Sequence, residues 1–351
     1  MSNILITGGA GFLGLHLALE GSKRSSVKKL LLADIADYER EEYPRKNVFL
    51  LKADVRDKAL MNEYIKEVDF VVHSAAALPL WKKEEIFSVN VEGTHTMLEL
   101  SLKNKIKRFI YISSTAVYGV PEKHPIVEDD PLVGVGPYGE SKIEAERLCF
   151  SYMKKGLPVT IIRPKTFVGP YRLGVFEILF DWVYDGKKIP VVGSGKNRYQ
   201  LLDVADLVDA VYLFLEDPSR KEFDDVFNIG AERFKTIKED LQEFFDSAGS
   251  GSRIFSTPAG VVKALLSLFY HLKISPLYPW VYATADKDSF VSIEKIKKVL
   301  NWRPKYSNSE ALIRAYKWYL KHYKEVKSKG EGITHRVGWK QGILGLVKRF
   351  M

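Results

Sequence analysis

The feature that most constrains this chain is a glycine-rich turn between an apolar run and a helical stretch near the N-terminus. Residues 4–14 read Ile-Leu-Ile-Thr-Gly-Gly-Ala-Gly-Phe-Leu-Gly. In such a unit Gly8 permits the tight turn, Gly11 lets the backbone approach a pyrophosphate, and Gly14 lets helix and strand pack closely. The following helix offers its unpaired N–H groups to phosphates. The turn therefore predicts a dinucleotide-binding strand–turn–helix unit.

Short apolar runs alternate with longer amphipathic stretches through the first half of the chain. The runs are continuous rather than alternating in polarity, which is typical of buried parallel strands. They cover residues 4–7, 29–33, 48–51, 70–73, 109–113 and 159–163. Helical stretches at 84–104 and 138–155 lie between them, so we expect an α/β fold with a doubly wound Rossmann sheet.

The pattern loosens after Gly169-Pro170, which suggests a second domain. We expect a dinucleotide-binding domain, a smaller and mostly helical substrate-binding domain, and a tail. Their predicted ranges are 1–170, 171–325 and 326–351, with 199–230 returning to the first domain. The apolar run at 226–229 is the strand expected to rejoin the sheet.

Two aspartates follow predicted strands. Asp34 lies twenty residues after Gly14, where a carboxylate accepts hydrogen bonds from the adenosine ribose and repels a 2′-phosphate. The sequence therefore predicts NAD rather than NADP as cofactor. Asp54-Val55 ends the third strand, where an acid reaches the adenine amine, although an ordinary turn aspartate fits this position equally well.

Tyr138 and Lys142 open a predicted helix and share one face of it, because they are four residues apart. A free tyrosine has a pKa near 10, and a nearby ammonium favours the phenolate and lowers that value. Ser113-Ser114-Thr115 ends the preceding strand, where a hydroxyl can hydrogen-bond the reacting oxygen. These residues predict proton abstraction from a substrate hydroxyl.

With these motifs the chain resembles the extended short-chain dehydrogenase/reductase family, the NAD-dependent epimerase/dehydratase group. The matching segments keep the family's order over about two-thirds of the chain. They are Thr7–Gly14, Asp34, Asp54-Val55, His73–Ala76, Asn90–Thr94, Ser113–Gly119, Tyr138–Lys142, Arg163-Pro164, Gly169-Pro170, Asp203–Asp206 and Leu300–Pro304.

The resemblance implies roles for these residues. Ser114, Tyr138 and Lys142 would carry catalysis. The residues that would contact NAD are Gly8, Gly11, Phe12, Leu13, Gly14, Asp34, Asp54, Val55, Ala75, Asn90, Tyr138, Lys142 and Pro164. The resemblance also implies a homodimer through the helices that contain Asn90–Asn104 and Tyr138. We expect a dimer face because apolar positions exceed one sheet-facing stripe, at Ile86, Val89, Met97, Leu98 and Leu102.

The positions after Ser114 distinguish reactions within the group. Sugar dehydratases and decarboxylating relatives carry acids there, whereas this chain has Thr115-Ala116, which disfavours dehydration. We expect an epimerase of a nucleotide-diphosphate sugar, with Thr115, Thr166 and Arg198 at the substrate. We include Arg198 because its neighbour, Tyr199, occupies the position where members of the group usually carry the arginine that binds the diphosphate.

The alternative is a 3β-hydroxysteroid or other lipid-alcohol dehydrogenase, which also uses NAD. The segments Gly193–Asn197 and Asp203–Asp206 resemble that branch. The apolar stretch Val261–Tyr270 is interpreted either as the lining of a lipid pocket or as a core helix. The reaction class therefore stays open between these two readings.

Composition limits the partners. The net charge is +9 and the pI about 9.2, which suits a phosphorylated substrate or an anionic membrane. The arginine-rich helices typical of nucleic-acid binding are not found, and we expect neither nucleic acid nor a metal. The single cysteine, Cys149, excludes an internal disulfide and fits a reducing compartment. With no targeting segment recognised, we expect a cytoplasmic protein.

The last residues form a basic amphipathic segment. Trp339, Ile343, Leu346, Val347 and Phe350 fall at helical spacing on one face. Such a helix suits the surface of an anionic membrane, which would place the protein peripherally at the inner membrane surface through 338–351. The equally weighted alternative is that this stripe docks on the protein itself.

Overall fold

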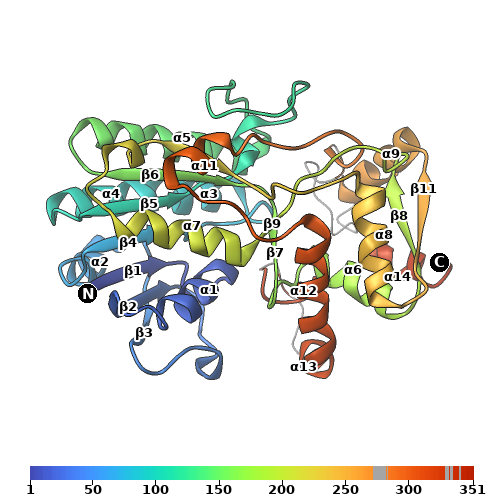
Figure 1. Ribbon diagram of the computed structural model, residues 1–351, viewed down its shortest axis with the longest axis horizontal. Helices are drawn as coiled ribbons and strands as arrows, with labels where there is room; N and C mark the ends of the chain where they lie inside the picture. The colour runs from blue at the N-terminus through green and yellow to red at the C-terminus, as the bar shows by residue number, and fades with distance from the viewer. Residues whose placement is uncertain (272–281, 283, 329–331, 333–334, 340) are drawn as a thin grey trace.

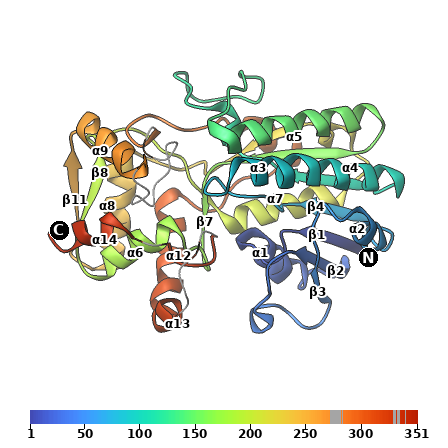
Figure 2. The same cartoon turned by 180° about the vertical axis from the view of Figure 1, so that it is seen from behind.

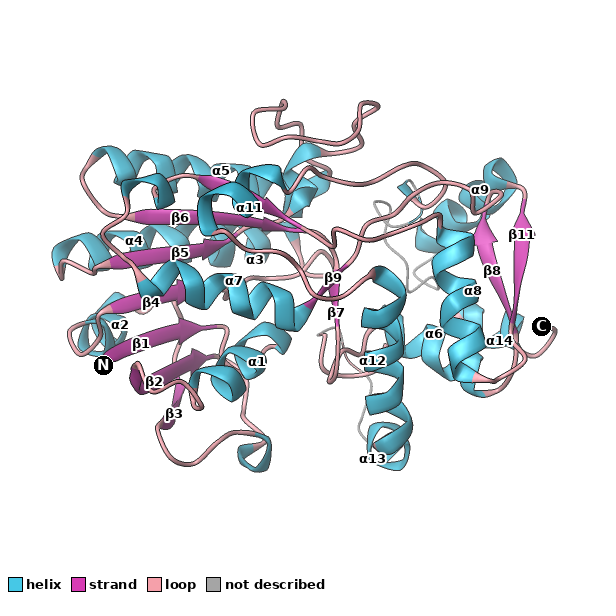
Figure 3. Ribbon diagram, in the orientation of Figure 1, coloured by secondary structure: helices cyan, strands magenta, loops and turns pink. Residues whose placement is uncertain are grey.

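The computed structural model describes residues 1–351 apart from 272–281, 283, 329–331, 333–334 and 340. A seven-stranded parallel sheet forms its larger half, with the order β10–β6–β5–β4–β1–β2–β3 (Figures 1 and 3). The strands are β1 (Ser2–Thr7), β2 (Val27–Asp34), β3 (Val48–Lys52), β4 (Phe70–His73), β5 (Arg108–Ile112), β6 (Val159–Pro164) and β10 (Val226–Ile229). The chain order reverses between β1 and β4, where a doubly wound sheet opens its ligand crevice.

Helices cover both faces of this sheet, as predicted for a Rossmann fold. One face carries α2 (Lys58–Ile65), α3 (Lys83–Phe87), α4 (Thr94–Lys103) and α5 (Gly136–Lys154), and the other carries α1 (Phe12–Gly21), α7 (Val204–Glu216) and α11 (Glu294–Leu300) (Figures 1 and 2). Each face has its own hydrophobic core. Strand β10 pairs with β6 in parallel, so the chain returns to the sheet where the sequence predicts it.

The predicted helix at 84–104 is interrupted. A six-residue π-helical segment, Ser88–Gly93, joins α3 to α4 and contains Asn90, a residue expected at the cofactor. Such π-helical insertions recur at functional sites. Three short 3₁₀ turns, at Arg40–Glu42, Thr115–Tyr118 and Lys221–Phe223, complete this half of the molecule.

The second half is smaller and mostly helical. It consists of α6 (Val175–Tyr184), α8 (Ile237–Ala248), α9 (Ala259–His271), α12 (Asn308–Lys321), α13 (Tyr323–Ser328), α14 (Ile343–Lys348) and two small parallel sheets, β8 (Lys188–Val192) with β11 (Arg253–Thr257) and β7 (Phe167–Val168) with β9 (Leu202–Asp203). Its aromatic-rich core is built mainly by α6, α8 and α12. The β7–β9 pair lies between the two halves (Figure 3).

The structure changes the argument for a dimer face. Ile86, Val89, Met97 and Leu98 are buried in the core between α3–α4 and the sheet of a single chain, and Leu102 packs against that core. The surplus of apolar positions arises because the π-helical segment shifts the helix face, so these side chains are used within one chain. They do not supply the exposed face that the sequence suggested.

Among the described residues, no helix combines the length and the apolar character that crossing a bilayer requires.

Candidate active site

The glycine-rich turn adopts the shape that dinucleotide binding needs. Gly8 has a φ of +74°, and a Cβ there would lie 2.8 Å from the backbone nitrogen of Ala75. A Cβ on Gly14 would lie 2.4 Å from the carbonyl oxygen of Gly8. Gly11 is the N-cap of α1 and offers no side chain to cap it, so the first-turn N–H groups at Phe12 and Leu13 can bind phosphate. These residues fit a dinucleotide.

The two aspartates differ in their surroundings. Asp34 accepts hydrogen bonds from the backbone nitrogens of Ala10 at 3.0 Å and Ala36 at 2.9 Å. Burial raises its pKa, and these bonds oppose the rise. Asp54 instead pairs with Arg56 at 2.5 Å, and the hydrogen bond from Arg56 lowers its pKa. Asp34 is therefore hydrogen-bonded to the backbone of the glycine-rich turn, whereas Asp54 forms an ion pair with Arg56.

Val55 and Asn90 hold segments of the crevice in place and do not present reactive groups to it. Val55 is buried, and its Cγ2 leaves no room for a Cβ on Gly93. The Asn90 amide donates to the Ala77 carbonyl at 3.2 Å and to the Ser141 hydroxyl at 3.0 Å. Asn90 thus ties the segment after β4 to α5, which carries Tyr138 and Lys142.

Ser114, Tyr138 and Lys142 come together at the carboxyl ends of β5 and β6. A hydrogen bond with Ser114 and the charge of Arg172 lower the pKa of Tyr138, but burial outweighs both and raises it to about 12. Lys142 donates to the Ile112 carbonyl at 3.0 Å, and its Nζ lies 5.9 Å from the Tyr138 ring centroid. Burial lowers the pKa of Lys142 to about 8. Arg172 is thus a cation whose charge lowers the pKa of Tyr138, and the Lys142 ammonium lies near the same ring.

A buried ion pair lies beneath this group. Arg163 on β6 donates to both carboxylate oxygens of Glu146 on α5, at 2.9 and 2.6 Å. The Ser113 hydroxyl donates to the same carboxylate at 2.5 Å, and Arg163 also reaches the Tyr118 hydroxyl at 2.7 Å. The pair locks α5 against β5 and β6 and thereby sets the position of Tyr138.

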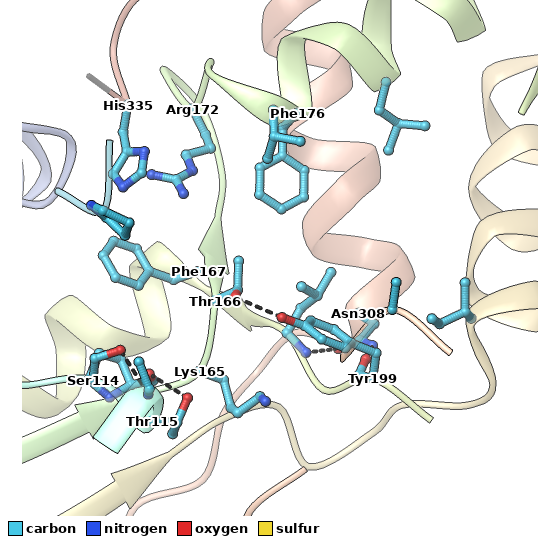
Figure 4. A pocket seen from close by; sticks show the side chains of 18 of the residues that line it. Ser114, Thr115, Lys165, Thr166, Phe167, Arg172, Phe176, Tyr199, Asn308 and His335 are labelled. Atoms are coloured by element: carbon cyan, nitrogen blue, oxygen red, sulfur yellow. Dashed lines mark hydrogen bonds between the residues drawn. The ribbon is translucent and has the colours of Figure 1, made fainter. Parts of the chain in front are cut away.

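A cavity of about 540 Å³ extends from Ser114 and Tyr138 into the second half of the molecule. Its wall combines residues of the sheet edge with side chains from α6, α8 and α12 (Figure 4). Much of the lining is apolar, including Phe176, Leu179, Val191, Leu241 and Leu312. A cavity of this size accommodates a substrate of several hundred daltons.

The expected substrate residues separate into two groups. Thr115 and Thr166 line the cavity, with Thr115 donating to the Pro164 carbonyl at 3.3 Å and Thr166 bonded to the Tyr199 hydroxyl at 3.2 Å. Arg198 does not line it. Its guanidinium lies 4.7 Å from the ring centroids of Phe234 and Phe290, which corrects the expectation that Arg198 replaces the diphosphate-binding arginine.

The stretch Val261–Tyr270 also lies apart from the cavity. It falls within α9, where Val261, Leu265 and Leu268 are exposed. None of the described residues of α9 lines the cavity, so this helix does not form the lipid-pocket wall that the sequence allowed.

The C-terminal segment docks on the protein. Lys348 pairs with Asp181 on α6 at 2.5 Å and with Asp185, the residue after α6, at 2.7 Å. Trp339 is buried and lines the cavity, and Leu344 and Val347 pack against the aromatic-rich core of the second half. Trp339 and Val347 of the predicted stripe therefore follow the docking alternative, whereas Leu346 and Phe350 are exposed. A peripheral membrane placement is not supported.

Comparison with known proteins identifies the family. Residues 4–230 match the NAD dependent epimerase/dehydratase family. The chain belongs to this family. It is 34% identical to the uncharacterized protein y4nG of Sinorhizobium fredii, over 98% of this chain and 85% of that protein. It is 29% identical to the UDP-N-acetyl-alpha-D-glucosaminuronate decarboxylase of Bacillus cytotoxicus, over 90% and 97% of the two chains.

A solved structure agrees with this membership. The dTDP-glucose 4,6-dehydratase of Bacillus anthracis, in complex with NAD, superposes with a TM-score of 0.74 at 25% identity, over 92% of this chain and 98% of that chain. As a member of the NAD-dependent epimerase/dehydratase family, the protein is an enzyme that uses NAD.

Four residues of the cavity wall are among those that the sequence did not predict. Lys165 and Arg172 follow β6, and His335 and Trp339 belong to the tail, yet all four line the cavity. Lys165 directly follows the matched Arg163-Pro164 pair, which was the available signal. The tail residues had no such signal, because their contacts to the cavity join segments more than 150 residues apart.

Proposed function

We propose that this enzyme is an NAD-dependent epimerase of a nucleotide-diphosphate sugar. The observation that carries the proposal is the chemistry of the cavity wall. Two buried cations, Lys165 and Arg172, line it, which suits a substrate with anionic groups. Among the described lining residues the only carboxylate is Asp240. It accepts hydrogen bonds from the Asn308 amide at 2.8 Å and from the Lys235 backbone nitrogen at 3.2 Å.

The lack of an available acid separates epimerisation from dehydration. Eliminating water needs an acid and a base besides the tyrosine. Thr115 and Ala116 line the cavity where the group's dehydratases carry acids, and Asp240 is held by its partners in α12 and the segment before α8. Epimerisation needs only the proton transfer that Tyr138 provides.

In the proposed mechanism, each residue has one task. Tyr138 takes the proton of the substrate hydroxyl while Ser114 hydrogen-bonds the reacting oxygen and orients it. NAD, held by the residues assigned below, would supply both the hydride acceptor and the hydride donor of the reaction. Tyr138 then gives the proton back. Arg172 and Lys142 favour the phenolate through their charge, and Thr115 and Thr166 contact the sugar.

The cofactor contacts follow the geometry of the crevice. We assign the pyrophosphate to Gly11, Phe12 and Leu13 with Gly8 and Gly14 shaping the turn, and the adenosine ribose to Asp34. Asp54 and Val55 lie toward the adenine. The nicotinamide end is assigned to Ala75, Asn90, Tyr138, Lys142 and Pro164.

The test is product analysis. The NAD-loaded protein is incubated in D₂O with UDP-glucose, UDP-N-acetylglucosamine or UDP-glucuronic acid, and the products are separated and examined by NMR. We expect an epimer without deuterium at the inverted carbon, since the hydride returns from the cofactor rather than from solvent. A 4-keto-6-deoxy product would instead establish a dehydratase.

A second candidate is a dehydrogenase of a sterol or another lipid alcohol. The apolar residues of the cavity wall, Phe176, Leu179, Val191, Leu241 and Leu312, favour it. Such an enzyme would reduce added NAD when given 3β-hydroxysterols or long-chain alcohols, which absorbance at 340 nm would detect. We expect no such reduction, because two buried cations in the same wall are costly beside an uncharged lipid.

Assembly is part of the proposal. We propose a homodimer that pairs the outer faces of α4 and α5, where the partly exposed Phe150 of α5 supplies an apolar contact. Light scattering should give twice the 40.0 kDa chain mass. A concentration-independent mass of one chain would reject the dimer.

A further inference from the structure

Lys165 is a buried cation in the wall of the substrate cavity. It follows the last residue of β6, is 2% exposed, and lines the cavity together with Ser114 and Thr115 (Figure 4). Its Nζ donates to the Ser289 hydroxyl at 2.7 Å and lies 4.8 Å from the Tyr199 ring centroid. The ammonium thus has two neutral neighbours, a hydroxyl and an aromatic face.

The residues that the structure describes supply no counter-charge to this ammonium. Within the described part of the chain, no carboxylate forms an ion pair with Lys165. Desolvation lowers the pKa of Lys165 to about 7, without an opposing contribution from a nearby acid. Burying an unpaired ammonium is costly, so this position would be filled by an apolar residue if packing were its only role.

The position of Lys165 relates it to the reacting end of the substrate. The preceding residue, Pro164, accepts a hydrogen bond from Thr115, the neighbour of Ser114. The remainder of the cavity runs away from this point toward α6, α8 and α12. The Lys165 stem thus starts beside the reacting end, whereas its Nζ reaches Ser289 and Tyr199, and Tyr199 stands where the group's diphosphate-binding arginine is usual.

We propose that Lys165 binds an anionic oxygen group of the substrate, either the diphosphate or a carboxylate on the sugar of a nucleotide-linked uronic acid. This inference rests on the proposed function. Both groups offer oxyanions to the cation. Every nucleotide sugar has the diphosphate, whereas only a uronic acid has the carboxylate, so removal of the cation weakens binding of all nucleotide sugars in the first case and of uronic acids alone in the second.

The experiment measures binding rather than turnover. UDP-glucuronic acid and UDP-glucose are titrated by calorimetry into the NAD-loaded wild type, Lys165→Met and Lys165→Arg proteins. Met keeps the length and apolar stem of the side chain but removes the charge. Lys238→Met is the control, since Lys238 is exposed and lies next to the lining residue Ile237 without lining the cavity itself.

We expect Lys165→Met to lose at least tenfold in affinity for UDP-glucuronic acid and to unfold at a higher temperature than the wild type. An unchanged affinity for UDP-glucose would assign the bound group to the sugar carboxylate. Lys165→Arg should restore most of the lost affinity, and Lys238→Met should match the wild type. An equal loss for both ligands would still support oxyanion binding and would assign it to the diphosphate.

Two results would overturn the inference. If Lys165→Met bound both ligands as tightly as the wild type, Lys165 would not contact an anion, and the proposed function would be unaffected. If the wild type bound neither nucleotide sugar, the proposed function would fail and the inference with it. The wild-type titration therefore separates the two failures.

Discussion

Arg336, in the C-terminal tail, donates a hydrogen bond of 2.9 Å to the carbonyl oxygen of Ala10 in the glycine-rich turn. The same guanidinium donates to the Tyr43 hydroxyl at 2.9 Å and pairs with Glu42. Burial raises the pKa of Asp34, and the charge of Arg336 opposes that rise. The end of the chain thus closes onto the start of the dinucleotide crevice.

This contact predicts a role for the tail in holding the cofactor. Arg336→Met should raise the NAD dissociation constant several-fold and speed NAD release. The reason is that the glycine-rich turn loses the hydrogen bonds through which Arg336 connects it to Tyr43, in the segment between β2 and β3. Fluorescence-monitored release of NADH measures the rate. Arg349→Met, an exposed tail arginine, is the control, and equal release rates in both variants would contradict the prediction.

Cofactor choice should depend on Asp34. Its carboxylate is expected to bind the ribose hydroxyls and to repel a 2′-phosphate, so the wild type should bind NAD much more tightly than NADP. Asp34→Ala should narrow this difference by weakening NAD binding and relieving the repulsion. Asp37→Ala, which removes an exposed acid, should leave the ratio unchanged, and a wild-type preference for NADP would refute the assignment.

Removal of the Tyr138 hydroxyl should separate chemistry from binding. Tyr138→Phe deletes the proton acceptor and keeps the ring, so kcat should fall by at least a thousandfold while NAD affinity stays close to that of the wild type. Lys142→Ala should weaken both, since Lys142 is fully buried beside the same ring. A Tyr138→Phe protein with most of its turnover would exclude Tyr138 as the base.

The Arg163–Glu146 pair should be important for stability. Glu146→Gln leaves a buried guanidinium without its counter-charge, which costs about 3–5 kcal/mol in the free energy of unfolding. Glu144→Gln, in the exposed Glu144–Arg147 pair on the same helix, should cost less than about 1 kcal/mol. Urea unfolding of the two variants provides the comparison. Equal losses in the free energy of unfolding would mean that the buried pair stabilises the fold no more than the exposed pair does.

Stability should decrease in mild acid because of His16. Burial lowers its pKa from 6.5 to about 4, against the hydrogen bond with the Pro170 carbonyl. The unfolded chain therefore binds the proton first, and the free energy of unfolding falls as the pH drops from 6.5 toward 4, by up to about 1.4 kcal/mol per pH unit. His16→Gln keeps a donor but does not titrate, so its unfolding should depend less steeply on pH over this interval.

Local motifs made much of the fold and cofactor site predictable. Gly8, Gly11 and Gly14 act through backbone geometry within one turn, and Tyr138 and Lys142 share a face by helical spacing alone. The parallel strands were recognisable because burial on both faces demands continuous apolar runs. These features depend on residues close in sequence, so the sequence by itself determines a Rossmann domain, its NAD-binding turn and the Tyr138–Lys142 pair.

The tertiary structure decided which side chains reach the cavity. Arg198 and Tyr199 are neighbours in an extended segment, where successive side chains point to opposite sides. The bridge between Tyr199 and Ser289 turns Tyr199 inward and leaves Arg198 against Phe234 and Phe290. Likewise the tail reaches the glycine-rich turn across 326 residues. Such contacts depend on how distant segments pack, and no local pattern of residues encodes them.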